Sequence, residues 1–109
     1  MHKLKIFMID PDKPGSAQYM FLDREDIRPE IYRLVYEGFE ESTELEKLFE
    51  KYNKDDRLNR MTCRSLSVSD IVCFEDEDGS HECHICKMIG WKRLSEEIYE
   101  QLNGLNIDK

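Results

Sequence analysis

The residues that most resemble a chemical site lie in one short stretch, His81-Glu82-Cys83-His84-Ile85-Cys86. It combines Cys-x-x-Cys spacing with two histidines, and both side-chain types are common zinc ligands. A structural zinc knuckle, however, needs a tight turn between its cysteines, usually made with Gly or Pro, and His84-Ile85 provides neither. The other two cysteines, Cys63 and Cys73, are too far apart in sequence to form a second close pair.

A strand through this stretch would separate its cysteines, because successive side chains of a strand point to opposite faces. Asp78-Gly79 predicts a two-residue hairpin turn, since a type I′ turn needs positive φ at both central residues. That turn would pair Phe74 with Cys83 and Cys73 with His84. The resulting register would place three possible ligands on one face: Cys73, His84 and Cys86. A metal site there is one hypothesis and redox use of Cys-x-x-Cys is another, but we favour cysteines that pack as small hydrophobic side chains, with no cofactor.

Two charged clusters are candidate interaction surfaces. The first, at the expected hairpin tip, is acidic and consists of Glu75, Asp76, Glu77 and Asp78. A calcium loop would be longer and would carry carboxylates at alternate positions, so we favour a solvated tip, with a weak cation site or a docking surface as alternatives. The second cluster is basic and consists of Arg57, Arg60 and Arg64. It could bind phosphate or an acidic partner, but we favour pairing with nearby carboxylates.

The remaining polar residues form no recognisable catalytic motif. Ser65, Ser67 and Ser69 lie close together, but no Gly-x-Ser-x-Gly elbow surrounds them. The five glycines are not grouped in a phosphate-binding pattern. Trp91 follows Gly90 and is expected as a core anchor or rim residue, and an exposed Trp91 would favour an interface. We therefore expect no enzyme.

The elements that must position these residues indicate an α+β fold. We expect a small mixed or antiparallel sheet of four to five strands packed with one or two helices. The expected strands are 4–9, 31–38, 71–75 and 82–89, with a possible continuation at 92–94, and the expected helices are 43–53 and a last one after Ser95. Thr43 and Glu46 fit a capping box for the first helix. Ser95 fits the N-cap of the last helix, and Gly104 its C′ residue.

Composition limits the function classes. The 109 residues carry 24 Asp and Glu against 16 Lys and Arg, a formal net charge of -8. These values exclude a membrane span, a collagen-like fibre and a basic nucleic-acid-coating protein. We expect one domain over residues 1–109, with 104–109 as a frayed tail. The start lacks the features of a signal peptide, so we expect a cytoplasmic protein whose four cysteines are free thiols.

One segment resembles a known family. Arg64-Ser65-Leu66-Ser67-Val68-Ser69-Asp70-Ile71-Val72 is similar to the Arg-Ser-Leu-Ser-Val-x-Asp-Val-Val box of the YodL-like family. Four further segments match the family in order: Ile9-Asp10-Pro11, Tyr32-Arg33-Leu34-Val35-Tyr36-Glu37-Gly38, Leu45-Glu46-Lys47-Leu48-Phe49 with Asn53, and Ile89-Gly90-Trp91-Lys92. The resemblance covers residues 4–94. Around 81–86 the family more often carries Tyr and Asp, which argues against zinc.

The resemblance implies a small cytoplasmic domain found on phages and conjugative elements or within their polyvalent proteins, with no established enzymatic activity. It implies binding to a host or element protein. We therefore expect a non-catalytic protein-interaction module linked to a mobile genetic element, with no membrane partner. The alternative is a PUA-like nucleic-acid-binding domain that uses Arg57–Arg64, against which the acidic charge argues. The candidate interaction surface consists of Arg57, Arg60, Arg64, Ser67, Asp70, Trp91, Glu75, Asp76, Glu77 and Asp78.

Overall fold

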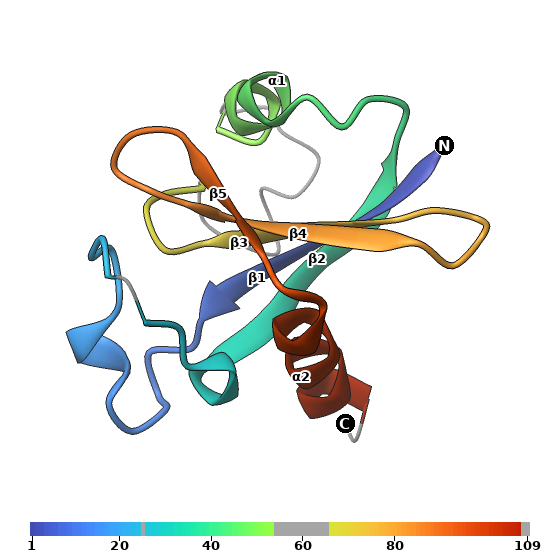
Figure 1. The fold of residues 1–109 in the computed structure, drawn as a ribbon. Helices are drawn as coiled ribbons and strands as arrows, with labels where there is room; N and C mark the ends of the chain where they lie inside the picture. Colours follow the sequence, from blue (N-terminus) through green and yellow to red (C-terminus); the bar gives the residue numbers. More distant parts are fainter. Residues whose placement is uncertain (25, 54–65, 108–109) are drawn as a thin grey trace.

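The fold is a sheet with one helix on each face (Figure 1). The computed structural model describes residues 1–24, 26–53 and 66–107, with side chains described as far as residue 104. In these ranges five strands form one antiparallel sheet in the order β2-β1-β3-β4-β5. The predicted α+β class is therefore confirmed.

The elements follow the predicted ones closely, with differences at their ends. The strands are β1 (His2–Ile9), β2 (Tyr32–Glu40), β3 (Ile71–Glu75), β4 (His81–Cys86) and β5 (Trp91–Leu94), the helices are α1 (Leu45–Lys51) and α2 (Glu96–Ile107), and two 3₁₀ turns are η1 (Ser16–Gln18) and η2 (Pro29–Ile31). The strand expected over 82–89 ends early, because Gly90 adopts a φ of 73° and turns the chain back into β5. The helix expected to end before Gly104 continues to Ile107.

The inner strand β1 carries buried apolar side chains on both faces, because a helix covers each face of the sheet. Leu4 and Ile6 pack with Leu48 and Tyr52 on the α1 side. The α2 side contains Phe7, Ile9, Ile71, Cys73, Cys83, Ile85, Tyr99 and Leu102. The two helices thus cover the two faces of the sheet and leave the ends of its strands uncovered.

The two helix starts differ in their capping. The hydroxyl of Ser95 accepts a hydrogen bond from the backbone N–H of Ile98 at 3.4 Å, which confirms the predicted cap of α2. The predicted capping box of α1 is wrong. Glu44 occupies the N-cap position without a side-chain bond, and its own N–H donates to the hydroxyl of Ser42. The helix thus begins one residue later than the capping box requires, and Ser42 accepts a different N–H, that of Glu44.

The β3–β4 register also differs from the predicted one. Cys73 pairs with Cys83, Phe74 with Glu82 and Val72 with His84. The connecting loop is wider than a two-residue turn and spans residues 76–80, closed by the Asp76 N–H donating to the Ser80 carbonyl at 2.8 Å. The carboxylate of Asp78 accepts bonds from the N–H and the hydroxyl of Ser80, which stabilises this wider loop.

Candidate interaction surface

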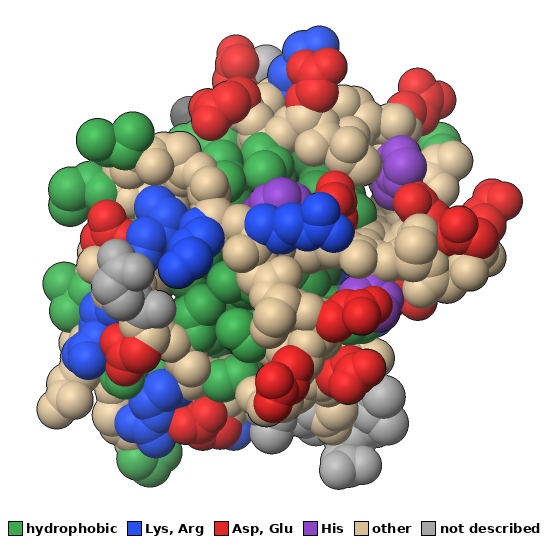
Figure 2. Space-filling model, in the orientation of Figure 1, with side chains coloured by type: hydrophobic (Ala, Val, Ile, Leu, Met, Phe, Trp, Pro, Cys, Tyr) green, Lys and Arg blue, Asp and Glu red, His purple; other side chains and the backbone are tan. Residues whose placement is uncertain are grey.

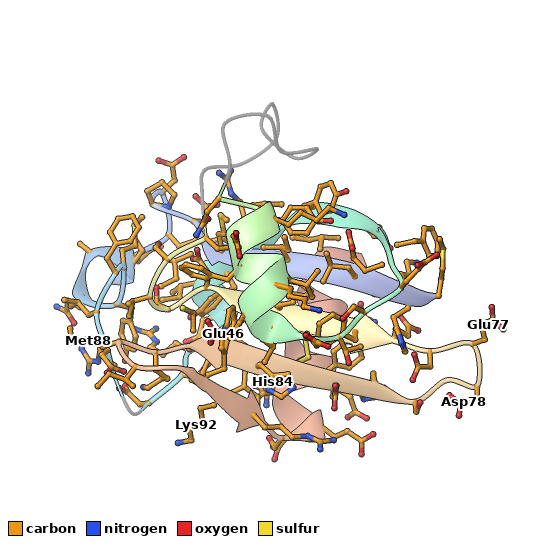
Figure 3. All side chains as sticks on the ribbon, turned by 90° about the horizontal axis from the view of Figure 1, so that it is seen from above. Glu46, Glu77, Asp78, His84, Met88 and Lys92 are labelled. Carbon is orange, nitrogen blue, oxygen red and sulfur yellow. A yellow bond between two sulfur atoms is a disulfide. The ribbon has the colours of Figure 1, made fainter. Side chains whose placement is uncertain are left out.

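Two acidic stretches that lie far apart in the sequence meet at one end of the sheet. β1 begins between the ends of β2 and β3, with His2 opposite Glu40 and Lys3 opposite both Phe39 and Glu75. We call this region the acidic end and define it by its carboxylates: Glu37, Glu40, Glu41, Glu75, Asp76, Glu77 and Asp78. Figure 3 shows Glu77 and Asp78 at the tip of the β3–β4 hairpin, at the opposite end from Met88.

Lysines neutralise only part of the acidic end. Lys3 lies 2.6 Å from Glu37, Lys51 lies 2.7 Å from Glu40, and Lys5 lies 3.5 Å from Glu75. The hydrogen bond and charge of Glu37 raise the pKa of the Lys3 ammonium. The seven carboxylates of the acidic end outnumber the three paired lysines by four. The acidic end therefore has an excess of negative charge.

A hollow of about 500 Å³ opens among these charges. It is lined by Met1, Lys3, Phe39, Glu75, Asp76 and Glu77. Phe39 is 65 % exposed and Met1 is 71 % exposed, although both are large apolar side chains. Together they form an exposed apolar patch with a charged rim, and patches of this kind are candidate interaction sites. Sequence reasoning missed Phe39, because only the pairing of β2 with β1 places it beside the acidic loop.

Two of these carboxylates also support the fold. The Glu40 carboxylate is buried, accepts a hydrogen bond from the Tyr52 hydroxyl and pairs with Lys51. Burial and this bond raise the pKa of Tyr52 above its usual range. The Tyr99 hydroxyl donates to Glu75 at 3.3 Å, and burial raises the pKa of Tyr99 to about 12. Glu37, Glu41, Glu77 and Asp78 are the exposed carboxylates of this end.

Ser67 and Asp70, predicted as surface residues, belong to the turn before β3. Asp70 is fully buried, and its carboxylate accepts a hydrogen bond from the Ser67 N–H at 2.8 Å. Asp70 also joins its backbone to β4, because the Cys86 N–H donates to its carbonyl at 2.8 Å. A partner cannot reach Asp70 in this fold, so its prediction as a docking residue is wrong.

Ser69 fixes the geometry of this turn, because it forms hydrogen bonds to three segments that are distant in the sequence. Its φ is 81°, which is unusual for a residue with a side chain. Its N–H donates to the Cys86 carbonyl at 2.9 Å, and its carbonyl accepts from the Tyr32 hydroxyl at 2.6 Å. Its hydroxyl accepts from the Phe21 N–H at 3.3 Å. The segment that carries the family resemblance is therefore a structural joint.

Trp91 is a partly buried anchor rather than an exposed interface residue. Its ring meets Phe49 of α1 edge-on, with the ring centres 6.1 Å apart. Both rings line a smaller hollow of about 190 Å³ with Glu46, Cys86, Lys87, Met88 and Gly90. This agrees with the predicted core or rim position.

The cysteine and histidine residues do not share the face predicted for a metal. Cys73 points to the α2 side and forms a disulfide with Cys83, whereas His84 and Cys86 alternate onto the other face. The predicted common face is wrong because the wider hairpin loop shifts the register. In the described part of the chain, no three such ligands come together.

The prediction of free thiols is wrong for Cys73 and Cys83. Cys86 is a free, buried thiol, and burial raises its pKa to about 11. Cys63, like Arg57, Arg60 and Arg64, lies outside the described residues. The nucleic-acid alternative, which depends on these arginines, stays a prediction.

The opposite end of the sheet carries an apolar patch that the sequence patterns did not single out. It consists of Phe21, Leu22, Met88 and Ile89, which are between 48 % and 92 % exposed. Lys87 holds the two segments together through Asp23 at 2.6 Å and the Arg24 carbonyl at 2.7 Å. Figure 2 shows hydrophobic side chains along the left edge and acidic ones along the right edge. The molecule is thus chemically different at its two ends.

Comparison with known families supports the resemblance noted from the sequence. The model of the YodL-like domain matches residues 3–103. The chain belongs to the YodL-like family. No curated protein and no solved structure matches this YodL-like chain. Neither helix of the described residues is long and apolar enough to cross a membrane.

Proposed function

We propose that this YodL-like domain is a non-catalytic protein-interaction module whose acidic end binds a basic segment of a partner protein. The observation that carries the proposal is the meeting of residues 37–41 and 75–78 around an exposed Phe39. Neither stretch alone makes such a surface. Together they combine excess negative charge with an apolar anchor in one hollow.

The two components of this surface have different roles in binding. Carboxylates that exceed the local lysines attract a basic partner over several ångströms and orient its approach, an effect that salt weakens. Phe39 supplies affinity, because covering apolar surface contributes about 25 cal/mol per Å². Aromatic side chains near the centre of an interface commonly dominate its binding energy.

Two features support a role without catalysis. The raised pKa of Cys86 keeps its thiol protonated at neutral pH, whereas a nucleophilic cysteine needs the thiolate. The Ser69 hydroxyl is engaged by the Phe21 N–H and lies in a buried turn. As part of the same proposal, the partner is a host protein or a protein of a mobile element, encountered in the cytoplasm.

Capture from bacterial lysate with three immobilised proteins tests the proposal. The wild type is compared with a Phe39→Ser/Glu77→Gln variant at the acidic end and with a Met88→Ser/Ile89→Ser variant at the opposite end. All four substituted side chains are exposed, so both variants should fold.

We expect basic proteins to be retained at low salt by the wild type and by the Met88→Ser/Ile89→Ser control, and to be lost at high salt. The Phe39→Ser/Glu77→Gln variant should lose them at low salt as well. Retention of the same proteins by all three, or no retention by the wild type, would contradict the proposal.

A further inference from the structure

We propose that Cys73 and Cys83 form a reversible dithiol–disulfide site, reduced by a dithiol, whose oxidised state holds the base of the acidic hairpin loop. The two residues face each other directly on β3 and β4, with their Cα atoms 4.1 Å apart. Facing residues of a non-hydrogen-bonded pair lie about 4.5 Å apart in any antiparallel sheet. Both oxidation states therefore fit the same strand pairing.

The position of the pair favours slow, selective exchange. Both cysteines are 1 % exposed and pack beneath α2 with Tyr99 and Leu102. A hollow of about 390 Å³ between β4, β5 and the start of α2 is nevertheless lined by Cys83 and not by Cys73. His81 and Tyr99 also line this hollow, and their stacked rings have centroids 4.0 Å apart. A reductant that enters as these rings move apart would meet the Cys83 sulfur first.

The exchange chemistry then follows in two steps. A thiolate of the dithiol attacks Sγ of Cys83, the disulfide breaks, and Cys73 leaves as a thiolate that takes up a proton. The second thiolate of the reductant displaces Cys83 from the mixed disulfide, and Cys83 takes up a proton in turn. The dithiol becomes a disulfide, and two electrons pass to the cysteine pair.

The consequence for the fold is local. The disulfide joins β3 and β4 two residue pairs away from the loop, which is closed by the backbone bond between Asp76 and Ser80. Oxidation limits the opening of these two strands, whereas reduction leaves only the strand hydrogen bonds to hold the loop. A change in partner binding through this loop rests additionally on the proposed function.

Thiol counting tests the site itself. A Cys63→Ser/Cys86→Ser variant retains only the two cysteines of the pair. After glutathione disulfide and unfolding in denaturant, a maleimide should label neither cysteine. After native incubation with dithiothreitol it should label both, and reoxidation should restore the unlabelled state. Labelling of both cysteines after oxidation, or of neither after dithiothreitol, would overturn the proposal.

Hydrogen exchange tests the local consequence in the wild-type protein. We expect amides of residues 74–82 to exchange several-fold faster after reduction, while those of β2 stay unchanged. Equal exchange in both states would overturn the assignment of a hairpin clamp. Neither measurement uses a binding partner, so failure here leaves the proposed docking surface standing, and failure of docking leaves the redox site standing.

Discussion

At the scale of single residues, the segment that carries the family resemblance stabilises the fold. Ser69 holds a left-handed backbone conformation that costs about 1 kcal/mol or more for a residue with a side chain, and hydrogen bonds to three segments offset it. The serine and aspartate pattern was visible in the sequence. Their burial was not, because a polar residue before a strand is ordinarily exposed and only tertiary contacts bury it.

The bond from Tyr32 to the Ser69 carbonyl gives a direct test of this joint. Tyr32→Phe removes the hydroxyl that donates to the buried carbonyl of Ser69. Because that carbonyl loses this hydrogen bond, the free energy of unfolding should fall by about 1–3 kcal/mol. Tyr99→Phe is the control, because its hydroxyl makes a longer bond to a partly exposed carboxylate. Urea unfolding should show a much smaller loss for Tyr99→Phe, and equal losses would argue against the joint.

Cys86 predicts a pH dependence of stability. Its folded pKa is raised from 9.0 to about 11 by burial, so the folded state keeps a proton that the unfolded state releases. The contribution of this protonated thiol is complete below pH 9 and is lost as the pH rises toward 11. The stability advantage of wild type over Cys86→Ala, measured by denaturant unfolding, should shrink across that window. An advantage that stays constant from pH 8 to 11 would refute this.

At the scale of elements, the strands were predictable where periodicity was strong, and the hairpin register was not. Asp78-Gly79 is typical of a two-residue turn, but the hydrogen bonds that Ser80 donates to the Asp78 carboxylate favour the wider loop. Because side chains alternate with period two, one step of register moves Cys73 from His84 to Cys83. The wider loop thus sets a register in which Cys73 faces Cys83 and forms a disulfide, and the register predicted for a metal site does not form.

The helix caps supply a matched pair of substitutions. Ser95→Ala removes the bond to the Ile98 N–H and should lower the free energy of unfolding by about 1 kcal/mol. Thr43→Ala should have almost no effect, because Thr43 lies outside the N-cap position of α1. Thermal and urea unfolding of both variants checks this. If Thr43→Ala lowered the free energy of unfolding as much as Ser95→Ala, the capping box at Thr43 would be supported after all.

At the scale of the whole molecule, the charge is organised by strand order. The net charge of -8 and the two acidic stretches are plain in the sequence. That they meet follows only from β1 lying between β2 and β3, a long-range pairing that no local pattern encodes. In the same topology, the apolar turn with Met88 and Ile89 lies at the end of the sheet opposite the acidic end, and both side chains are exposed.

The central claim is that the acidic end is the docking site, and chemical-shift mapping tests it most directly. The ¹⁵N-labelled domain is titrated with a synthetic lysine- and arginine-rich peptide that contains one leucine. Amides of residues 37–41 and 75–78 should shift together, and 0.5 M salt or the Phe39→Ser/Glu77→Gln variant should suppress the shifts. Shifts confined to residues 87–92, or none at either end, would contradict the account.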